Sequence, residues 1–144
     1  MVKLILGEKG SGKTKWLIDN ANKDMKEGNG NIAFIDVDDD HIFTLNYNVR
    51  LINAMEFNIL DVESFYGFLC GLIGMDYDVE KIYVDSIYKI IKLDIPKLEK
   101  LVRDLNIICE KFEMEFFINV DYTIEQIPDN LKEYCIELEA EYAV

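Results

Sequence analysis

Residues 2–14 read Val-Lys-Leu-Ile-Leu-Gly-Glu-Lys-Gly-Ser-Gly-Lys-Thr, a short apolar run followed directly by a glycine-rich loop. The run from Val2 to Leu6 is typical of a buried strand in a parallel sheet. From Lys13 the spacing becomes helical, because apolar side chains recur at every fourth position from Leu17 to Met25. The segment therefore predicts a strand, a loop and a helix in succession.

The loop fills every fixed position of the pattern G-x-x-x-x-G-K-[ST]. It consists of Gly7, Glu8, Lys9, Gly10, Ser11, Gly12, Lys13 and Thr14. Glycines let backbone N–H groups point at phosphate oxygens, and the following helix presents its positive end to the same charge. Lys13 is expected to reach the β- and γ-phosphates as a catalytic residue, and the Thr14 hydroxyl to coordinate Mg²⁺. The loop thus predicts a site for a nucleoside triphosphate. The lack of a suitably placed Asn-Lys-x-Asp guanine-reading motif favours ATP.

A second candidate residue, Asp85, ends the apolar run Ile82-Tyr83-Val84. If this run is a strand, the carboxylate emerges at the carboxyl edge of the sheet, where ligands bind in open α/β folds. There it is expected to accept a hydrogen bond from Thr14 and from a magnesium-bound water. Asp85 is therefore a predicted metal-site residue together with Thr14; the alternative is an aspartate that simply ends a strand.

Alternating patterns along the rest of the chain predict further strands and helices. The predicted strands are 2–6, 31–36, 49–54, 81–85, 115–120 and 135–138. The first predicted helix, 13–27, ends at Gly28-Asn29-Gly30, and the second, 62–73, lies between the N-cap Asp61 and Gly74. The third, 95–112, follows Asp94 and has Pro96 in its first turn. The fourth, 124–134, is broken at Pro128. Short connections between them predict a three-layer α/β/α fold with a mostly parallel central sheet, as one P-loop nucleotide-binding domain of residues 1–144.

Two further segments resemble the RecA-like ATPases. Residues 33–38, Ala-Phe-Ile-Asp-Val-Asp, are similar to the strand that follows the P-loop helix in that family, which reads Phe-Ile-Asp-Ala-Glu. Residues 82–86, Ile-Tyr-Val-Asp-Ser, are similar to the family's second nucleotide motif, an apolar strand that ends in Asp-Ser. Together with the loop at 7–14, three short motifs occur in the family's order. The resemblance is to this class of ATPase and to no single member of it.

The resemblance implies an additional-strand core, in which another strand separates the loop strand from the Asp85 strand. It also implies that Asp38 stands where the family has the catalytic glutamate that polarises the attacking water. Asp is one methylene shorter than Glu, so the strand end would have to lie closer. The alternatives for the same role are Asp36, Asp39, Asp40 and Glu56. Residues 36–40 are also compatible with a solvated acidic turn.

Asn119 is a third predicted catalytic residue, at the end of the strand Phe116-Phe117-Ile118, with Asp121 close behind it. In the RecA-like family a polar residue at this strand end can sense the γ-phosphate, and the Asn119 amide can donate to an anion. Polar residues are common at strand ends, so a purely structural role is the alternative.

Arginines are scarce, since the chain has only Arg50 and Arg103. Enzymes that transfer a phosphoryl group to a small acceptor usually clamp it with several arginines. An arginine finger also contributes about 10³–10⁵ in rate to GTP hydrolysis. The sequence therefore favours a slow Mg²⁺-dependent ATPase that acts as a switch or working part for a protein partner or in a homo-oligomer. A nucleotide-binding module without hydrolysis and a small-molecule kinase are the alternatives.

The overall composition limits the kinds of partner and the location that we expect for the protein. A net charge of −13 with only 15 Lys and Arg makes nucleic acid a poor partner, because an acidic surface repels phosphate backbones. No apolar run reaches the roughly 18–20 residues of a membrane span, and no export signal is evident, so we expect a cytoplasmic protein without membrane insertion.

Other reactive residues receive structural interpretations. The three cysteines, Cys70, Cys109 and Cys135, are expected to be buried free thiols. His41 is expected to be an exposed turn residue, with a functional histidine as the alternative. Residues 137–141 are expected to be a solvated acidic terminus or an interaction tail.

Overall fold

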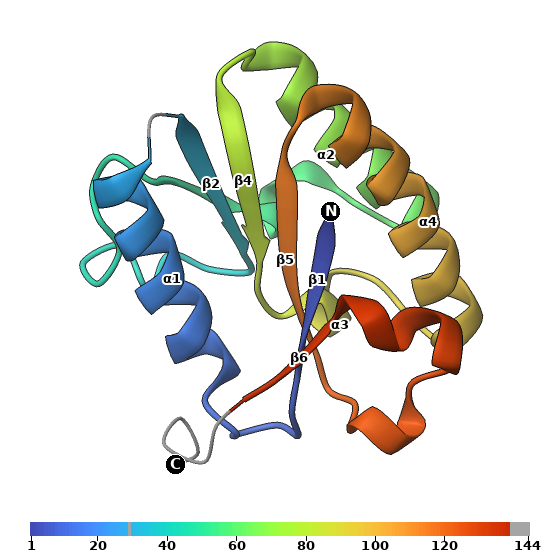
Figure 1. Ribbon diagram of the computed structural model, residues 1–144. Helices are drawn as coiled ribbons and strands as arrows, with labels where there is room; N and C mark the ends of the chain where they lie inside the picture. Colours follow the sequence, from blue (N-terminus) through green and yellow to red (C-terminus); the bar gives the residue numbers. More distant parts are fainter. Residues whose placement is uncertain (29, 139–144) are drawn as a thin grey trace.

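The computed structural model describes residues 1–28 and 30–138 (Figure 1). Its strands are β1 (Val2–Leu6), β2 (Asn31–Asp36), β3 (Arg50–Asn53), β4 (Val79–Val84), β5 (Glu115–Val120) and β6 (Cys135–Glu137). Its α-helices are α1 (Lys13–Glu27), α2 (Val62–Met75), α3 (Ile87–Ile90) and α4 (Ile95–Phe112). Three short 3-10 helices cover Ala54–Phe57, Ile124–Gln126 and Asp129–Tyr134.

The six strands form one sheet in the order β3-β2-β4-β5-β1-β6. Every neighbouring pair is parallel. β5 lies between β1 and β4, so the additional strand that the RecA-like resemblance implied is present. The three-layer α/β/α fold and the parallel sheet are thereby confirmed. All six carboxyl ends lie at one edge of the sheet.

One face of the sheet packs against α1 (Figure 1). The strand side chains of this layer are Ile5, Ile32, Phe34, Tyr83 and Phe117. They meet Leu17 and Ala21, which are fully buried on the inner side of α1. The Tyr83 ring stacks on the Phe117 ring, with centroids 4.7 Å apart. This packing fixes the direction of α1, and hence the end of the helix that follows the glycine-rich loop.

The opposite face packs against α2 and α4, which lie beside each other in Figure 1. Alternate strand residues such as Leu4, Ile35 and Ile118 point into this second and larger core. The α4 side chains that enter it are Leu98, Leu101, Val102, Leu105 and Cys109. Because successive side chains of a strand point to opposite faces, each buried strand serves both cores. This explains why the strands read as nearly continuous apolar runs.

Local capping sets the starts of both helices on this face. The Asp61 carboxylate accepts a hydrogen bond from Ser64 N at 2.8 Å, and Ser64 Oγ accepts one from Asp61 N at 3.0 Å, which completes a capping box. At α4 the Asp94 carboxylate likewise accepts a hydrogen bond from Lys97 N, at 2.9 Å, but no reciprocal side-chain contact between these two residues completes a capping box. Pro96 occupies the first turn, where its missing N–H needs no acceptor. Both predicted helix starts are confirmed.

The structure differs from the predicted helices in three places, and β3, β4 and β6 differ from the predicted strands by one or two residues at their ends. The predicted helix 124–134 is wrong: three and six residues on the two sides of Pro128 form short 3-10 helices instead, and the proline, which has no backbone N–H, interrupts the helical hydrogen bonds between them. α2 continues one residue beyond Gly74 to Met75. The four-residue helix α3 was not predicted at all. Asn29 and residues 139–141, which entered the predictions for a helix stop and an acidic terminus, lie outside the described residues.

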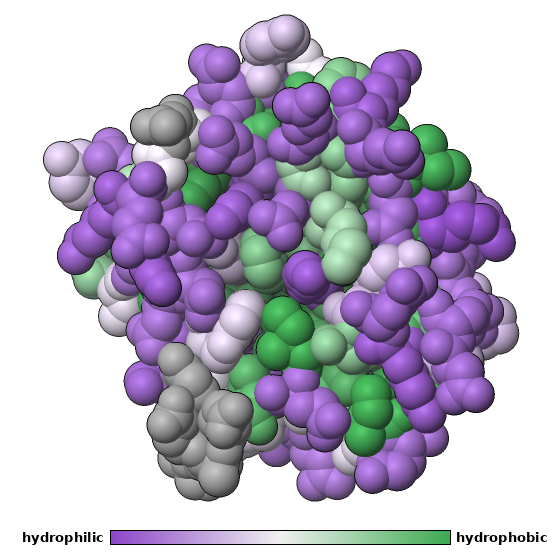
Figure 2. Space-filling view, in the orientation of Figure 1, coloured by the Kyte–Doolittle hydropathy of each residue, from purple (hydrophilic) through white to green (hydrophobic). Residues whose placement is uncertain are grey.

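The face shown in Figure 2 is mostly hydrophilic, in keeping with the net charge of −13. Hydrophobic residues gather in the middle of this face, between the helices that flank the sheet in Figure 1. None of the helices among the described residues combines the length and the apolar character needed to cross a bilayer. All three cysteines are free thiols; Cys109 is buried, and Cys70 and Cys135 are half-buried.

Candidate functional site

The carboxyl edge of the sheet holds all the buried polar side chains among residues 1–28 and 30–138. These are Lys13, Asp36, Asp85 and Asn119, each no more than 6% exposed. Burying a polar or charged group costs free energy unless it is paired. Their concentration at one edge, where parallel α/β folds bind ligands, therefore marks the candidate site.

The loop of residues 7–14 leaves β1 and enters α1 through residues with positive φ. Gly12 has φ 91° and forms the N-cap of α1, a conformation that L side chains rarely adopt. Gly7 has φ 156°, and a Cβ at this position would lie 2.2 Å from Ser11 Oγ. Ser11 Oγ is itself buried without a hydrogen-bond partner. The loop is thus tightly curled, and a polar atom is left unsatisfied inside it.

The Lys13 ammonium group is held above the loop by three oxygen atoms. Its Nζ donates to the carbonyl oxygens of Gly7 at 2.6 Å and Glu8 at 2.9 Å. It also pairs with Asp121 Oδ1 at 2.9 Å, just beyond the end of β5. The lysine is 6% exposed, whereas the Asp121 side chain is 47% exposed. A buried cation therefore faces a carboxylate that can turn away into solvent.

Thr14, Asp85 and Asn119 form a connected network beneath this lysine. Thr14 Oγ1 lies 3.1 and 3.0 Å from the two carboxylate oxygens of Asp85, to which it donates. The Asn119 amide also donates to Asp85 Oδ1, and its own carbonyl oxygen accepts from Ser86 N at 3.2 Å. Ser86 has φ 59°, so the chain turns sharply directly after Asp85. The predicted Thr14–Asp85 contact is present, and Asn119 fixes the carboxylate from the other side.

A cleft of about 820 Å³ opens over this network. It is lined by Lys9, Gly10, Gly12, Lys13, Thr14, Lys15, Asp85, Ser86, Tyr88, Lys89, Asn119 and Asp121. Seven of the predicted site residues are among them, whereas Gly7, Glu8, Ser11 and Asp38 are not. The volume lies within the range of about 300–1,000 Å³ that is usual for small-molecule sites.

The charge of the cleft is opposite to the charge of the whole protein. Its lining includes four lysines and two aspartates, while the chain as a whole carries −13. A positive concave surface attracts anions and raises their local concentration. Lys13 and the curled loop therefore lie in a locally positive cleft of an otherwise acidic protein.

The acidic turn after β2 lies beside the network. Asp38 Oδ1 accepts a hydrogen bond from Asp40 N at 3.0 Å, which stabilises the turn. Asp39 and Asp40 are exposed, and so is Glu56, in the 3-10 helix after β3. Asp36, the residue that ends β2, is buried instead. The four carboxylates of residues 36–40 thus lie in different environments.

Asp36 has a perturbed acidity. Burial raises its pKa from 3.8 to about 6, opposed by a hydrogen bond from Val37 N and reinforced by the nearby charge of Asp85. Its Oδ2 lies 3.8 Å from His41 Nε2 and accepts no hydrogen bond. His41 lies in a turn, as expected, but it is half-buried and faces Asp36, so its expected exposure is wrong. The loop folds back over the strand end, which the sequence does not signal.

Neither arginine belongs to the cleft. Arg103 is 67% exposed on α4, where its Nε lies 3.8 Å from an Asp104 carboxylate oxygen. Arg50 is exposed at the start of β3, away from the carboxyl ends of the strands. The positive side chains that line the cleft are all lysines.

Besides Lys15 of α1, the cleft includes Tyr88 and Lys89, which were not predicted as site residues. They belong to α3, which is too short to show a helical period. The turn at Ser86 that directs α3 toward the loop depends on an αL conformation at a non-glycine residue. The Asp-Ser ending of the strand was the only available signal.

The fold is that of the RecA-like α/β/α class. No protein-family model matches the sequence, and no curated protein matches it either. Among solved structures, the chain is similar to a KaiC-like protein from the hyperthermophilic archaeon Pyrococcus horikoshii, with a TM-score of 0.64 and 14% sequence identity. The similarity covers 96% of this chain and 71% of that chain. At this identity the likeness establishes the fold, and the chemistry of the site has to be argued from the residues.

Proposed function

We propose that this protein binds ATP with Mg²⁺ in the cleft over residues 7–14 and hydrolyses it slowly, as a switch or working part for a protein partner or within a homo-oligomer. The observation that carries the proposal is the contact of Thr14 Oγ1 with both carboxylate oxygens of Asp85. It joins the glycine-rich loop to a buried acid 71 residues away, and the same loop carries the buried Lys13 directly before Thr14.

The residues of the cleft fit a magnesium–triphosphate ligand. Lys13 supplies a buried positive charge for phosphate, and the unpartnered Ser11 hydroxyl is available within the loop. Thr14 and Asp85 offer the hydroxyl and carboxylate oxygens that Mg²⁺ prefers. Bound Mg²⁺ would supply neutralisation of phosphate charge. Gly7 and Gly12 keep the loop in the curled shape that no other residue type adopts easily.

Hydrolysis requires a group that orients water, and Asp38 is our proposed candidate. It follows β2 at the position of the glutamate in RecA-like ATPases. One oxygen of its half-buried carboxylate accepts a hydrogen bond from Asp40 N, so the second oxygen can make another contact. Asn119 is proposed to hold Asp85 in place and to respond to the ligand through the same amide.

The distribution of arginine favours slow turnover. No arginine of the described residues lines the cleft, so an arginine finger would have to come from a partner or a second copy. The same feature favours the second candidate function, a nucleotide-binding module without hydrolysis.

Phosphate release under Mg²⁺ and ATP tests the hydrolytic part of the proposal. We expect slow release by the native protein, none by Lys13→Ala, and native release by Lys23→Ala, which removes an exposed lysine further along α1. Asp38→Asn is expected to bind ATP normally and to lose turnover. Absence of release from the native protein, alone and with candidate partners, would support the non-hydrolysing module, and normal turnover in Asp38→Asn would refute the role of Asp38.

A further inference from the structure

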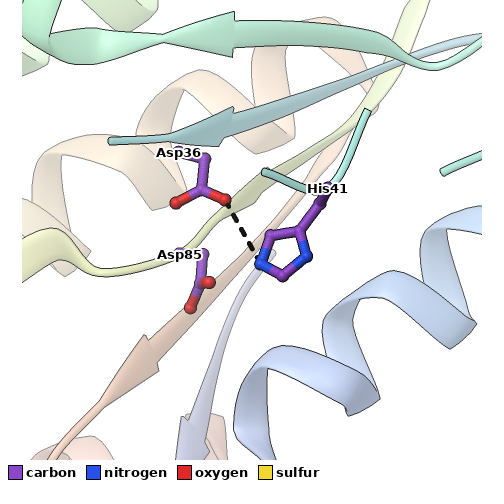
Figure 3. A group of neighbouring side chains, drawn as sticks. All are labelled: Asp36, His41 and Asp85. Carbon is purple, nitrogen blue, oxygen red and sulfur yellow. Dashed lines mark ion pairs between the residues drawn. The ribbon is translucent and has the colours of Figure 1, made fainter. Parts of the chain in front are cut away.

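A separate group of metal-ligating side chains lies on the β2 side of Asp85. Asp36 from the end of β2, His41 from the following loop and Asp85 face one another (Figure 3). One ligand atom from each residue lies within 4.8 Å of the other two. We propose that these residues bind a first-row divalent cation such as Mn²⁺, Co²⁺ or Zn²⁺, at a site next to that of the proposed magnesium–nucleotide complex.

Asp36 gives the strongest indication of a ligand. The residue is 2% exposed, and its Oδ1 accepts a hydrogen bond from Val37 N at 2.8 Å. Its Oδ2 is buried with no hydrogen-bond partner and faces His41 Nε2 at 3.8 Å. A buried carboxylate oxygen left unsatisfied is costly. A cation between Asp36 and His41 provides the missing partner.

Hydrogen bonds to backbone groups fix the loop that carries His41. The His41 carbonyl oxygen accepts from Thr44 N and Leu45 N, each at 3.0 Å. Asn22 of α1 clamps the same loop: its amide donates to Thr44 O at 2.9 Å, and its Oδ1 accepts from Asn46 N at 2.6 Å. These contacts leave the imidazole ring itself uninvolved. The ring is therefore positioned at the strand ends and remains 30% exposed, which gives an ion access from solvent.

The spacing of the group suits a small cation. Metal–ligand distances of about 2.0–2.2 Å place neighbouring ligands about 3–4 Å apart. Because the present separations reach up to 4.8 Å, the widest of them would have to contract by about 1–2 Å. Rotation of the half-exposed His41 side chain can provide this without disturbing the loop backbone.

The donor set distinguishes this site from a magnesium site. Mg²⁺ favours oxygen ligands only, whereas an imidazole nitrogen suits the later first-row ions. The two carboxylates of Asp36 and Asp85 balance a divalent charge. An ionised carboxylate offers about four lone-pair directions. Asp85 can therefore bind a cation on its β2 side while Thr14 and Asn119 contact its other lone pairs.

Titration of the nucleotide-free protein with Co²⁺, in the presence of excess Mg²⁺, tests the site directly. Excess Mg²⁺ occupies the exposed carboxylates, and the d–d absorption of Co²⁺ reports on its ligands. We expect one Co²⁺ per chain and a loss of affinity of at least about tenfold in His41→Ala and in Asp36→Asn. Asp39→Asn, which removes an exposed acid from the same turn, should bind Co²⁺ as the native protein does.

The controls separate this inference from the proposed function. His41→Ala keeps the backbone carbonyl contacts of the loop, and its thermal unfolding in chelator verifies that it folds. The inference is overturned if Co²⁺ does not bind, if His41→Ala binds it unchanged, or if a thiolate charge-transfer band shows that a cysteine is the ligand. Each result is obtained without nucleotide, so it stands apart from the outcome of ATP-binding experiments.

Discussion

Thr14 Oγ1 donates to both carboxylate oxygens of Asp85, at 3.0 and 3.1 Å. Thr14 lies in the first turn of α1, which follows β1 through the glycine-rich loop, and Asp85 directly follows β4; β5 separates these two strands. The contact therefore depends on the strand order of the whole sheet, and it brings together the two groups that we propose to hold Mg²⁺.

Replacing Thr14 tests this relationship. Thr14→Val keeps the shape of the side chain and removes its hydroxyl, so Mg²⁺ loses a ligand and Asp85 loses a donor. A hydrogen bond to a charged group contributes about 1.5–3 kcal/mol, which corresponds to an affinity for Mg²⁺–ATP that is about 10- to 100-fold lower. Thr14→Ser should remain near the native affinity. Fluorescence titration with and without Mg²⁺ measures both, and equal Mg²⁺ dependence in Thr14→Val and the native protein would contradict the assignment.

Asp121→Asn should strengthen nucleotide binding. Asp121 pairs with Lys13 at 2.9 Å and is half-exposed, so it competes with phosphate for the same ammonium group. A partly exposed ion pair contributes about 0.2–1 kcal/mol, so we expect a gain in ATP affinity of about 1.5- to 5-fold. Asp129→Asn is the matched control, since it removes an equal charge that pairs with Lys132 outside the cleft. A similar gain in both variants would show that only net charge matters.

Gly7→Ala and Gly10→Ala separate steric from conformational effects in the loop. Both glycines have positive φ, but only a Cβ at Gly7 meets Ser11 Oγ, at 2.2 Å, whereas one at Gly10 meets nothing within 4 Å. Positive φ alone costs about 1–2 kcal/mol for an alanine. Gly7→Ala should therefore lower the free energy of unfolding further than Gly10→Ala does. Denaturant unfolding measures the difference, and equal losses would indicate that Ser11 can move aside.

Much of this site could be predicted from the sequence, because its parts are local. The loop motif, the apolar strand before it and the aspartate after an apolar run each have a short-range signal. The contact between Asn119 and Asp85 has no short-range signal, because it depends on β5 lying between β1 and β4 in the sheet. The burial of His41 also has no short-range signal, because it depends on the hydrogen bonds by which Asn22 of α1 holds the loop over Asp36.

The free energy of unfolding should depend on pH because burial disfavours the ionised form of the Asp36 carboxylate. Its pKa is 3.8 in the unfolded chain and about 6 in the fold, so the folded state binds the proton more tightly. The associated stability is fully present below pH 4 and is lost as the pH rises through about 6. The whole shift corresponds to about 3 kcal/mol, of which about 1–1.5 kcal/mol falls between pH 5 and 7.5.

Asp36→Asn lacks this titration, so its stability relative to the native protein should increase over that interval. Urea unfolding in chelator at the two pH values measures the change. Asp39→Asn, with an exposed side chain, should show no such increase. A flat difference between Asp36→Asn and the native protein would mean that the Asp36 carboxylate is adequately solvated.

Calorimetric titration of Mg²⁺–ATP into the native protein, Lys13→Ala and Lys23→Ala tests the central claim most directly. Lys13 is the buried cation of the cleft, and Lys23 is an exposed lysine of the same helix. We predict saturable binding of one ATP per chain in the native protein and in Lys23→Ala, and no detectable binding in Lys13→Ala. Absence of binding in the native protein, or binding that Lys13→Ala leaves unchanged, would contradict the assignment of residues 7–14 as a nucleotide site.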